Sequence, residues 1–139
     1  MAHPERLTLE RLVDEARSER ELSRSSWERL RSVFGDRFVK AWRLVLEKRI
    51  KRYIFRPSER VVWVAVGQSG EHRILPAAEY CSCDDFYFRV IDGDAGVCYH
   101  LLAQRLADAL NSYQQILEED EAYPALAAEW RAWTYPHED

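Results

Sequence analysis

Apolar residues recur every three or four positions through the first fifty residues of the chain, which is the period of an amphipathic helix. This spacing predicts a helix over 8–23, with its charged face in water. It predicts a second short helix, capped by Ser25 or Ser26 and interrupted by Gly35, and a third helix over 36–50. The N-terminal part of the chain is therefore expected to be helical.

The pattern changes to that of β-strands after residue 50. The short runs 53–55 and 60–66 are rich in β-branched and aromatic residues, and each predicts a strand. A turn over 67–70 leads to an extended segment over 72–75, so we expect a hairpin that the 53–55 strand extends into a small sheet. Leucines and alanines over 101–110 then predict an amphipathic helix.

Composition places these elements in one compact α+β unit. The 139 residues are 47% apolar and 12% aromatic, with few glycines and prolines, which is enough to build a core. We divide the unit into an N-terminal helical segment (1–55), a central module (56–117) and an acidic, aromatic tail (118–139). No hydrophobic leader or membrane-spanning run is apparent, so a cytoplasmic protein without membrane contact is expected.

All three cysteines and one of the histidines form two close pairs, a CxC at 81–83 and a CxH at 98–100. Cys81, Cys83, Cys98 and His100 make a complete Cys₃His donor set for structural Zn²⁺, delivered as two pairs separated by a loop. A Cys/His nucleophile is less favoured, because no orienting acid or oxyanion site accompanies the pairs. Zinc acting as a Lewis acid would need an open coordination position. We therefore expect a zinc protein without enzymatic activity.

The flanking elements explain how the donors are presented. The hairpin exit delivers Cys81 and Cys83, whereas Cys98 and His100 lie at the first turn of the 101–110 helix. Unpaired N–H groups at a helix N-terminus favour the thiolate that binds metal. Structural zinc sites have apparent binding energies of about 10–16 kcal/mol, so loss of the metal is expected to unfold this half of the chain.

The central module resembles the SWIM zinc finger, a β-β-α unit with CxC before a variable loop and CxH at the start of a helix. The resemblance rests on Trp63 in the opening strand, on Cys-Ser-Cys-Asp-Asp-Phe at 81–86 and on Cys-Tyr-His-Leu-Leu-Ala at 98–103. Ala103 resembles the CxHxxA extension of SWIM subunits in Shu complexes, which assist recombinases of the RecA/RadA type. The chain also looks like small archaeal SWIM proteins. The resemblance implies a zinc module that partners such a recombinase, or a paralogue of one, in recombination or repair.

Charge is distributed unevenly along the chain. Residues 37–60 hold nine Lys or Arg against two Glu, whereas residues 61–139 hold four basic residues against fourteen acidic ones. A basic segment beside a zinc module is suited to phosphate contacts with single- or double-stranded DNA. The alternative is a solvated face whose cations pair with the acidic half. The candidate nucleic-acid contacts are Arg43, Lys48, Arg49, Lys51, Arg52, Arg56 and Arg60.

Aromatic residues in the loop and the tail allow two interpretations each. Phe86, Tyr87 and Phe88 either pack onto the zinc module, which we favour, or stack on exposed bases. The tail aromatics at 123–135 either fold back on the domain or form a surface for a protein partner. We expect His72 and His137 to be surface residues, because the donor set is already complete.

Three hypotheses follow for function. The first is a non-enzymatic interaction module that works with a RecA/RadA-type recombinase or paralogue. The second is a direct nucleic-acid-binding protein that uses the basic 37–60 segment, with zinc in a purely structural role. The third, least favoured, is an enzyme that uses zinc as a Lewis acid.

Overall fold

The computed structural model describes residues 4–67, 70–76, 80–81 and 98–132. In this part of the chain a helical region comes first, then four strands, a central helix, a fifth strand and a last helix. The elements are α1 (Pro4–Glu19), α2 (Arg24–Phe34), α3 (Asp36–Leu46), β1 (Ile50–Arg56), β2 (Arg60–Gly67), β3 (Gly70–Leu75), β4 (Tyr80–Cys81), α4 (Tyr99–Leu110), β5 (Gln114–Glu119), the 3₁₀ turn η3 (Asp120–Ala122) and α5 (Tyr123–Ala132). The predicted α+β fold is confirmed.

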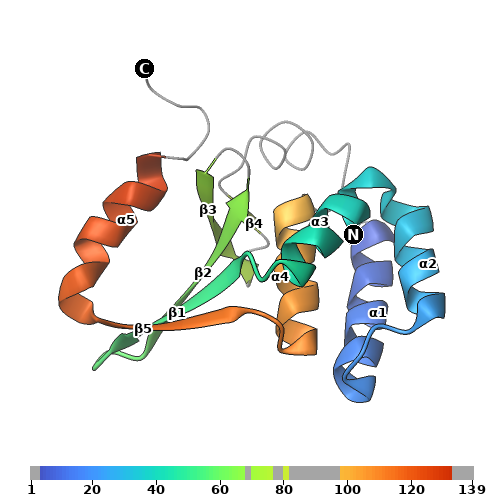
Figure 1. Cartoon of the computed structure of the whole chain (residues 1–139), viewed down its shortest axis with the longest axis horizontal. Coiled ribbons are helices and arrows are strands. Elements are labelled where there is room, and N and C mark those ends of the chain that lie inside the picture. Colours follow the sequence, from blue (N-terminus) through green and yellow to red (C-terminus); the bar gives the residue numbers. More distant parts are fainter. Residues whose placement is uncertain (1–3, 68–69, 77–79, 82–97, 133–139) are drawn as a thin grey trace.

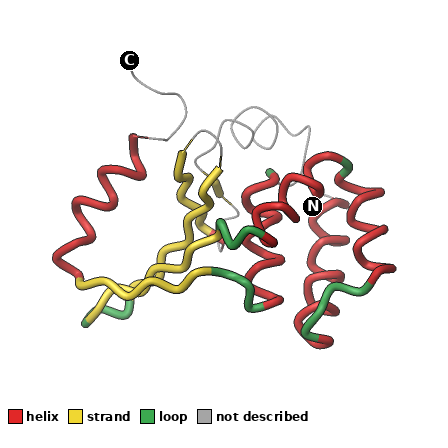
Figure 2. The backbone as a smooth tube through the Cα atoms, viewed as in Figure 1, coloured by secondary structure: helices red, strands yellow, loops and turns green. Residues whose placement is uncertain are grey.

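The strands form one sheet in the order β4-β3-β2-β1-β5. The pairs β1–β2, β2–β3 and β3–β4 are antiparallel, whereas β5 pairs with β1 in parallel, from Lys51 opposite Gln114 to Arg56 opposite Glu119. The predicted hairpin and its extension by the 53–55 strand are confirmed. Figures 1 and 2 show the sheet in the middle of the molecule, with α5 beyond one face and the other helices beyond the other.

Both faces of the sheet are buried, and successive residues of β2 show how. Trp63 and Ala65 belong to the core that the sheet shares with α1 to α4, whereas Val62 and Val64 belong to the core beneath α5. Side chains alternate between faces along a strand, and a strand buried on both sides reads as a continuous apolar run. That is the reason the 60–66 segment lacks polar residues after Arg60.

Three helix boundaries differ from prediction. The helix predicted over 8–23 is α1, which spans Pro4–Glu19. The α2 N-cap is Ser23, whose Oγ accepts a hydrogen bond from the Ser26 N–H at 3.1 Å, so neither Ser25 nor Ser26 is the cap. The third helix ends at Leu46 instead of continuing to residue 50, because Lys48 adopts a left-handed backbone with φ 54° and Ile50 pairs with Ala65 in the sheet. Gly35 separates α2 from α3 with φ 60°, as predicted.

The C-terminal segment contributes a strand that the sequence pattern did not predict. Residues 114–119 form β5 at one edge of the sheet, and α5 then folds back across it. Trp130 is 1% exposed and packs edge-on against Tyr53, with 5.2 Å between the ring centres. The described part of the tail therefore folds back on the domain, the first of the two predicted alternatives; Trp133 and Tyr135 lie outside the described residues.

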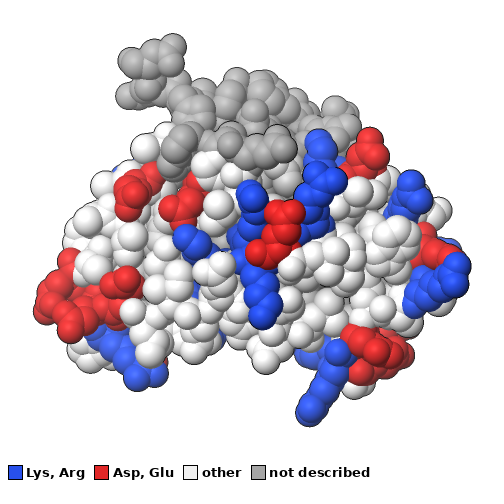
Figure 3. Space-filling model, viewed as in Figure 1, with Lys and Arg blue, Asp and Glu red and all other residues white. Residues whose placement is uncertain are grey.

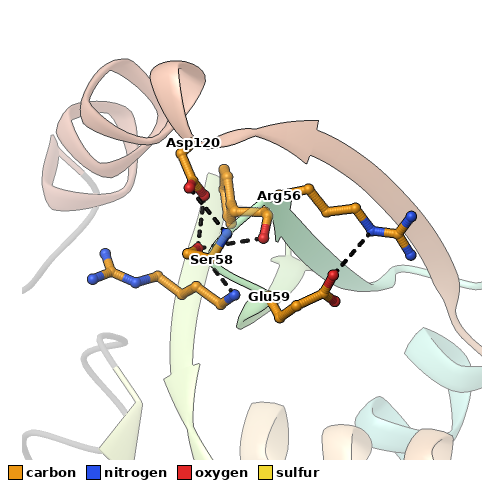
Figure 4. Close-up of polar contacts among 6 residues, drawn as sticks. Arg56, Ser58, Glu59 and Asp120 are labelled. Atoms are coloured by element: carbon orange, nitrogen blue, oxygen red, sulfur yellow. Dashed lines mark hydrogen bonds and ion pairs between the residues drawn. The ribbon is translucent and has the colours of Figure 1, made fainter.

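The tip of the β1–β2 hairpin is fastened to the turn between β5 and α5. The Asp120 carboxylate accepts hydrogen bonds from the Ser58 hydroxyl at 2.7 Å and from the Ser58 N–H at 3.0 Å, and Arg56 pairs with Glu59 in the same turn (Figure 4). These contacts fix where α5 begins relative to the sheet. No helix in the described part of the chain is long and apolar enough to span a membrane.

Candidate metal centre

The first turn of α4 positions Cys98 and His100, as predicted. Cys98 is the N-cap of the helix, and its Sγ accepts a hydrogen bond from the Leu101 N–H at 3.4 Å. Its side chain is completely buried. An N–H donor and the positive end of the helix dipole both stabilise a thiolate, which is the form of cysteine that binds Zn²⁺.

His100 is a buried imidazole with unused hydrogen-bonding capacity. Its side chain is 2% exposed, and neither ring nitrogen has a hydrogen-bond partner among the described residues. Two unsatisfied nitrogens in a buried ring are costly, and a metal bond to one of them would remove part of that cost. The residues present therefore fit a metal ligand at this position.

Gly67, at the end of β2, lies directly against this imidazole. A Cβ atom at this position would stand 2.9 Å from His100 Nε2 and 3.6 Å from the Tyr99 hydroxyl. A distance of 2.9 Å is shorter than such contacts normally are, so a side chain here would displace the histidine. The glycine that ends the strand thus also makes room for the His100 ring.

The first cysteine of the CxC pair belongs to a strand that contacts α4. Cys81 lies on β4, opposite Ile74 of β3, and β4 contacts α4. Cys83 lies outside the described residues. The described part of the structure thus brings the strand that carries one predicted ligand next to the helix that carries two others. The four-ligand zinc site remains a prediction.

His72 corrects one expectation, because it is a core residue and not a surface residue. It is 2% exposed on β3, and its ring centre lies 4.8 Å from that of His100. A signal was present in the sequence, because His72 precedes the buried Ile74 by two positions and so shares its face of the strand. His137 lies outside the described residues.

Gln104 is a buried polar residue of α4 that the sequence analysis missed. It follows His100 by four positions, so the two side chains lie on the same face of α4. It is 1% exposed, and its Oε1 has no hydrogen-bond partner among the described residues. Histidine ligands usually donate their second ring N–H to an acceptor. Gln104 Oε1 and the His100 ring nitrogens are not hydrogen-bonded to each other in this structure, so a role for Gln104 as that acceptor is a prediction.

The seven basic candidates do not form a single surface. Arg43 and Arg49 line one pocket beside α4, whereas Lys51 pairs with Glu71 at 3.3 Å on the α5 side of the sheet. Arg52 lies on the opposite face, donating to Gln115 at 3.0 Å, with its guanidinium 5.8 Å from the centre of the Trp63 ring.

The remaining three basic candidates are spread along β1, β2 and the residues next to them. Arg56 pairs with Glu59 at 3.5 Å, and the Arg60 guanidinium lies 4.3 Å from the centre of the Tyr123 ring. Lys48 is exposed in the connection between α3 and β1. Nucleic-acid contact by these residues remains a prediction, and so does base stacking by Phe86–Phe88, which lie outside the described residues.

Comparisons with known proteins cover 66–72% of the chain. No protein-family model matches it, and neither does any solved structure. The chain is similar to the zinc finger SWIM domain-containing protein 7 of Mus musculus, with 35% identity over 102 residues that cover 72% of this chain and 66% of the relative. The Homo sapiens protein of the same name is 34% identical over 93 residues, or 66% of each chain. A Dictyostelium discoideum homolog is 29% identical over 93 residues, or 66% of this chain and 60% of the relative.

The chain thus spans 60% of the length of the Dictyostelium relative and 66% of the two mammalian ones. All three relatives carry both "zinc finger" and "SWIM domain" in their names. These similarities agree with the resemblance seen in the CxC and CxH pairs. They support a SWIM-type zinc-finger family for this chain.

Proposed function

We propose that this chain is a zinc-binding SWIM protein that acts without catalysis, as a protein and DNA interaction module in recombination or repair. The observation that carries the proposal is the buried pair at the start of α4: Cys98 with its N–H donor, and His100, whose two ring nitrogens have no hydrogen-bond partner within the described ranges. Cys81 and Cys83 would complete the donor set. Bound zinc would supply a cross-link between the strand that carries Cys81 and the first turn of α4.

A non-catalytic role follows from the number of donors. Catalytic zinc sites keep a coordination position for water or substrate, whereas four protein ligands close the tetrahedron. Three thiolates and one imidazole are typical of a structural site. The chemistry of this chain is therefore to hold a surface in shape, and its function lies in what that surface contacts.

The proposed partner is a recombinase of the RecA/RadA type or one of its paralogues. The support is the resemblance of Cys98, His100 and Ala103 to the CxHxxA extension of Shu-type SWIM subunits. Ala103 itself is completely buried in the core shared by α1 to α4, so it serves helix packing. Contact with the partner would have to come from exposed residues.

Purification of native complexes with and without a metal chelator tests this proposal. A recombinase paralogue should be recovered with the zinc-loaded chain, be lost on chelation and return when Zn²⁺ is restored. The variant Cys98→Ser should lose the partner together with the metal, and Ser32→Ala on the exposed side of α2 is the matched control. Retention of the partner by metal-free protein, or recovery of partners unrelated to DNA, would contradict it.

Direct binding of nucleic acid is the second candidate function. Arg43 and Arg49 of the basic segment share one pocket, and that pocket adjoins the first turn of α4. The expected signature is an affinity that falls steeply with salt, because each phosphate contact releases a counterion.

A further inference from the structure

A pocket of about 300 Å³ lies where α3, the end of β2 and the start of α4 meet. Lys40 and Arg43 contribute from α3, Arg49 from the residue before β1, and Tyr99 is the first residue of α4. Figure 3 shows basic side chains gathered around an acidic one near the middle of this face, over α3 and the start of the sheet. Lys40 was not among the predicted contacts.

The charges of the pocket favour an anion. Three cations line it against one carboxylate, Glu47, and that carboxylate pairs with Arg49 at 2.8 Å. Arg43 makes no ion pair with another residue of the described ranges. Two guanidinium groups are well suited to phosphate, because each presents planar, paired donors. The first requirement of the ligand is therefore a phosphate group.

The size and aromatic wall of the pocket point to more than a bare ion. A volume of about 300 Å³ is at the lower end of pockets that hold small organic ligands. The centre of the Tyr99 ring lies 4.0 Å from the centre of the His100 ring. The Lys40 ammonium lies 5.6 Å from the centre of the Tyr99 ring. A lysine side chain is long enough to turn aside and leave an aromatic surface on which a base can stack.

We infer that this pocket binds one nucleotide unit of a single-stranded nucleic acid. Arg43 and Arg49 hold the phosphate, and Tyr99 contacts the base. Bases of a duplex are paired and stacked, so they cannot reach an aromatic ring inside a pocket. The inference rests on the proposed function, because zinc bound by Cys98 and His100 would fix the position of Tyr99 between them.

Fluorescence anisotropy of the zinc-loaded full chain, with a labelled oligothymidylate, tests the inference. The variant Arg43→Glu should weaken binding by about 10-fold or more. The matched control is Arg29→Glu, the same charge change at an exposed position of α2, which should leave the affinity within about 2-fold. Tyr99→Phe should retain binding, whereas Tyr99→Leu should lose about 5-fold or more. A duplex of the same length should bind more weakly than the single strand.

Competition identifies the source of the phosphate. A strand ligand requires that inorganic phosphate and thymidine monophosphate compete far less well than unlabelled oligothymidylate. Equal competition by the mononucleotide would mean a site for free nucleotides and would overturn the assignment to a strand. If Arg43→Glu and Arg29→Glu weakened oligothymidylate binding equally, or if the native chain did not bind it, the assignment of the binding site to this pocket would be wrong. Neither result would affect recovery of a recombinase partner, which tests the proposed function separately.

Discussion

The two faces of the sheet are covered in different ways. On one face α4 packs against the strands and is itself backed by α1 and α3, so that one core extends across three layers. On the other face α5 is the one helix of the described chain that covers the strands, over a small core of Tyr53, Phe55, Val62, Val64, Ala127 and Trp130. Figure 1 shows the contrast, with one helix to the left of the sheet and the remaining helices to its right.

The difference between the two faces indicates which part of the fold the proposed zinc would stabilise. α4 is held by a large apolar core, whereas β4 is two residues long and, among the described strands, pairs only with β3. Zinc would therefore stabilise the weak edge of the sheet by joining it to the strongest helix. The face covered by α5 carries none of the predicted zinc ligands that lie among the described residues.

Loss of a zinc ligand should have the largest effect and should separate the two faces. Cys98→Ser is expected to abolish stoichiometric zinc and to cause a large loss of stability, because such sites have apparent binding energies of about 10–16 kcal/mol. Hydrogen exchange should show lost protection in β3, β4 and the first turn of α4, while α5 stays protected. Equal loss of protection in α5 would contradict the comparison.

Removing the largest side chain beneath α5 should act on the other face. Trp130→Ala deletes an almost fully buried ring, so the free energy of unfolding in urea should fall by about 3–5 kcal/mol. Zinc content should not change. Glu129→Ala, at an exposed position of the same helix, should stay within about 0.5 kcal/mol of the native chain. Loss of zinc from the Trp130 variant would show that the two faces are coupled.

A larger side chain should destabilise the protein when it replaces a buried alanine of α4 but not when it replaces an exposed alanine of α5. Ala103 of α4 is completely buried, so Ala103→Leu should cost about 1–3 kcal/mol in a thermal or urea unfolding experiment. The same substitution at exposed Ala128 of α5 is the control, and it should have almost no effect. If both variants were equally stable, α4 would be packed less tightly than its burial indicates.

A substitution of Gln104 tests whether a second buried residue of α4 affects zinc binding. Gln104→Leu keeps the side-chain volume but removes the acceptor one turn from His100, so zinc affinity should fall by about 10- to 100-fold. Competition with a chelator of known affinity measures the change. Gln115→Leu, on the exposed edge strand, should leave zinc affinity unchanged. An unaltered affinity in the Gln104 variant would exclude a role as the acceptor.

The smallest effect concerns pH and the α5 face. Burial, with added repulsion from the charges of Glu71, Glu118 and Glu129, raises the pKa of Tyr53 from 10.0 to about 12. The unfolded chain then loses its phenol proton first, so stability should fall as pH rises from about 10 to 12 and be unaffected by Tyr53 below that range. Tyr53→Phe should remove this part of the alkaline loss, as measured by urea unfolding at several pH values.

Elements with a regular apolar period could be predicted from the sequence. The helices and strands β1 to β3 follow from local spacing, and the placement of Cys98 and His100 follows from the start of the α4 pattern. Strand β5 could not be found this way. Its residues Gln-Gln-Ile-Leu-Glu-Glu alternate weakly because it is an edge strand, and its parallel partner β1 lies about sixty residues earlier in the chain.

Residues that depend on tertiary contacts were missed for the same reason. Lys40 and Tyr99 line one pocket although they lie far apart in the sequence, and no local pattern connects them. Lys51 and Arg52 look like one basic patch in the sequence. The pleat of β1 sends them to opposite faces, where they meet Glu71 and Gln115. A charge run on a strand is thus a poor guide to a surface.

The parallel pairing of β5 with β1 affects how the chain can be shortened. A fragment that stops before Gln114 would leave β1 with a row of exposed N–H and C=O groups, an open template for adding a strand from another molecule. Such a piece is expected to self-associate even if every proposed zinc donor is kept. The minimal unit for biochemical work therefore extends to Ala132, well past the last CxH residue.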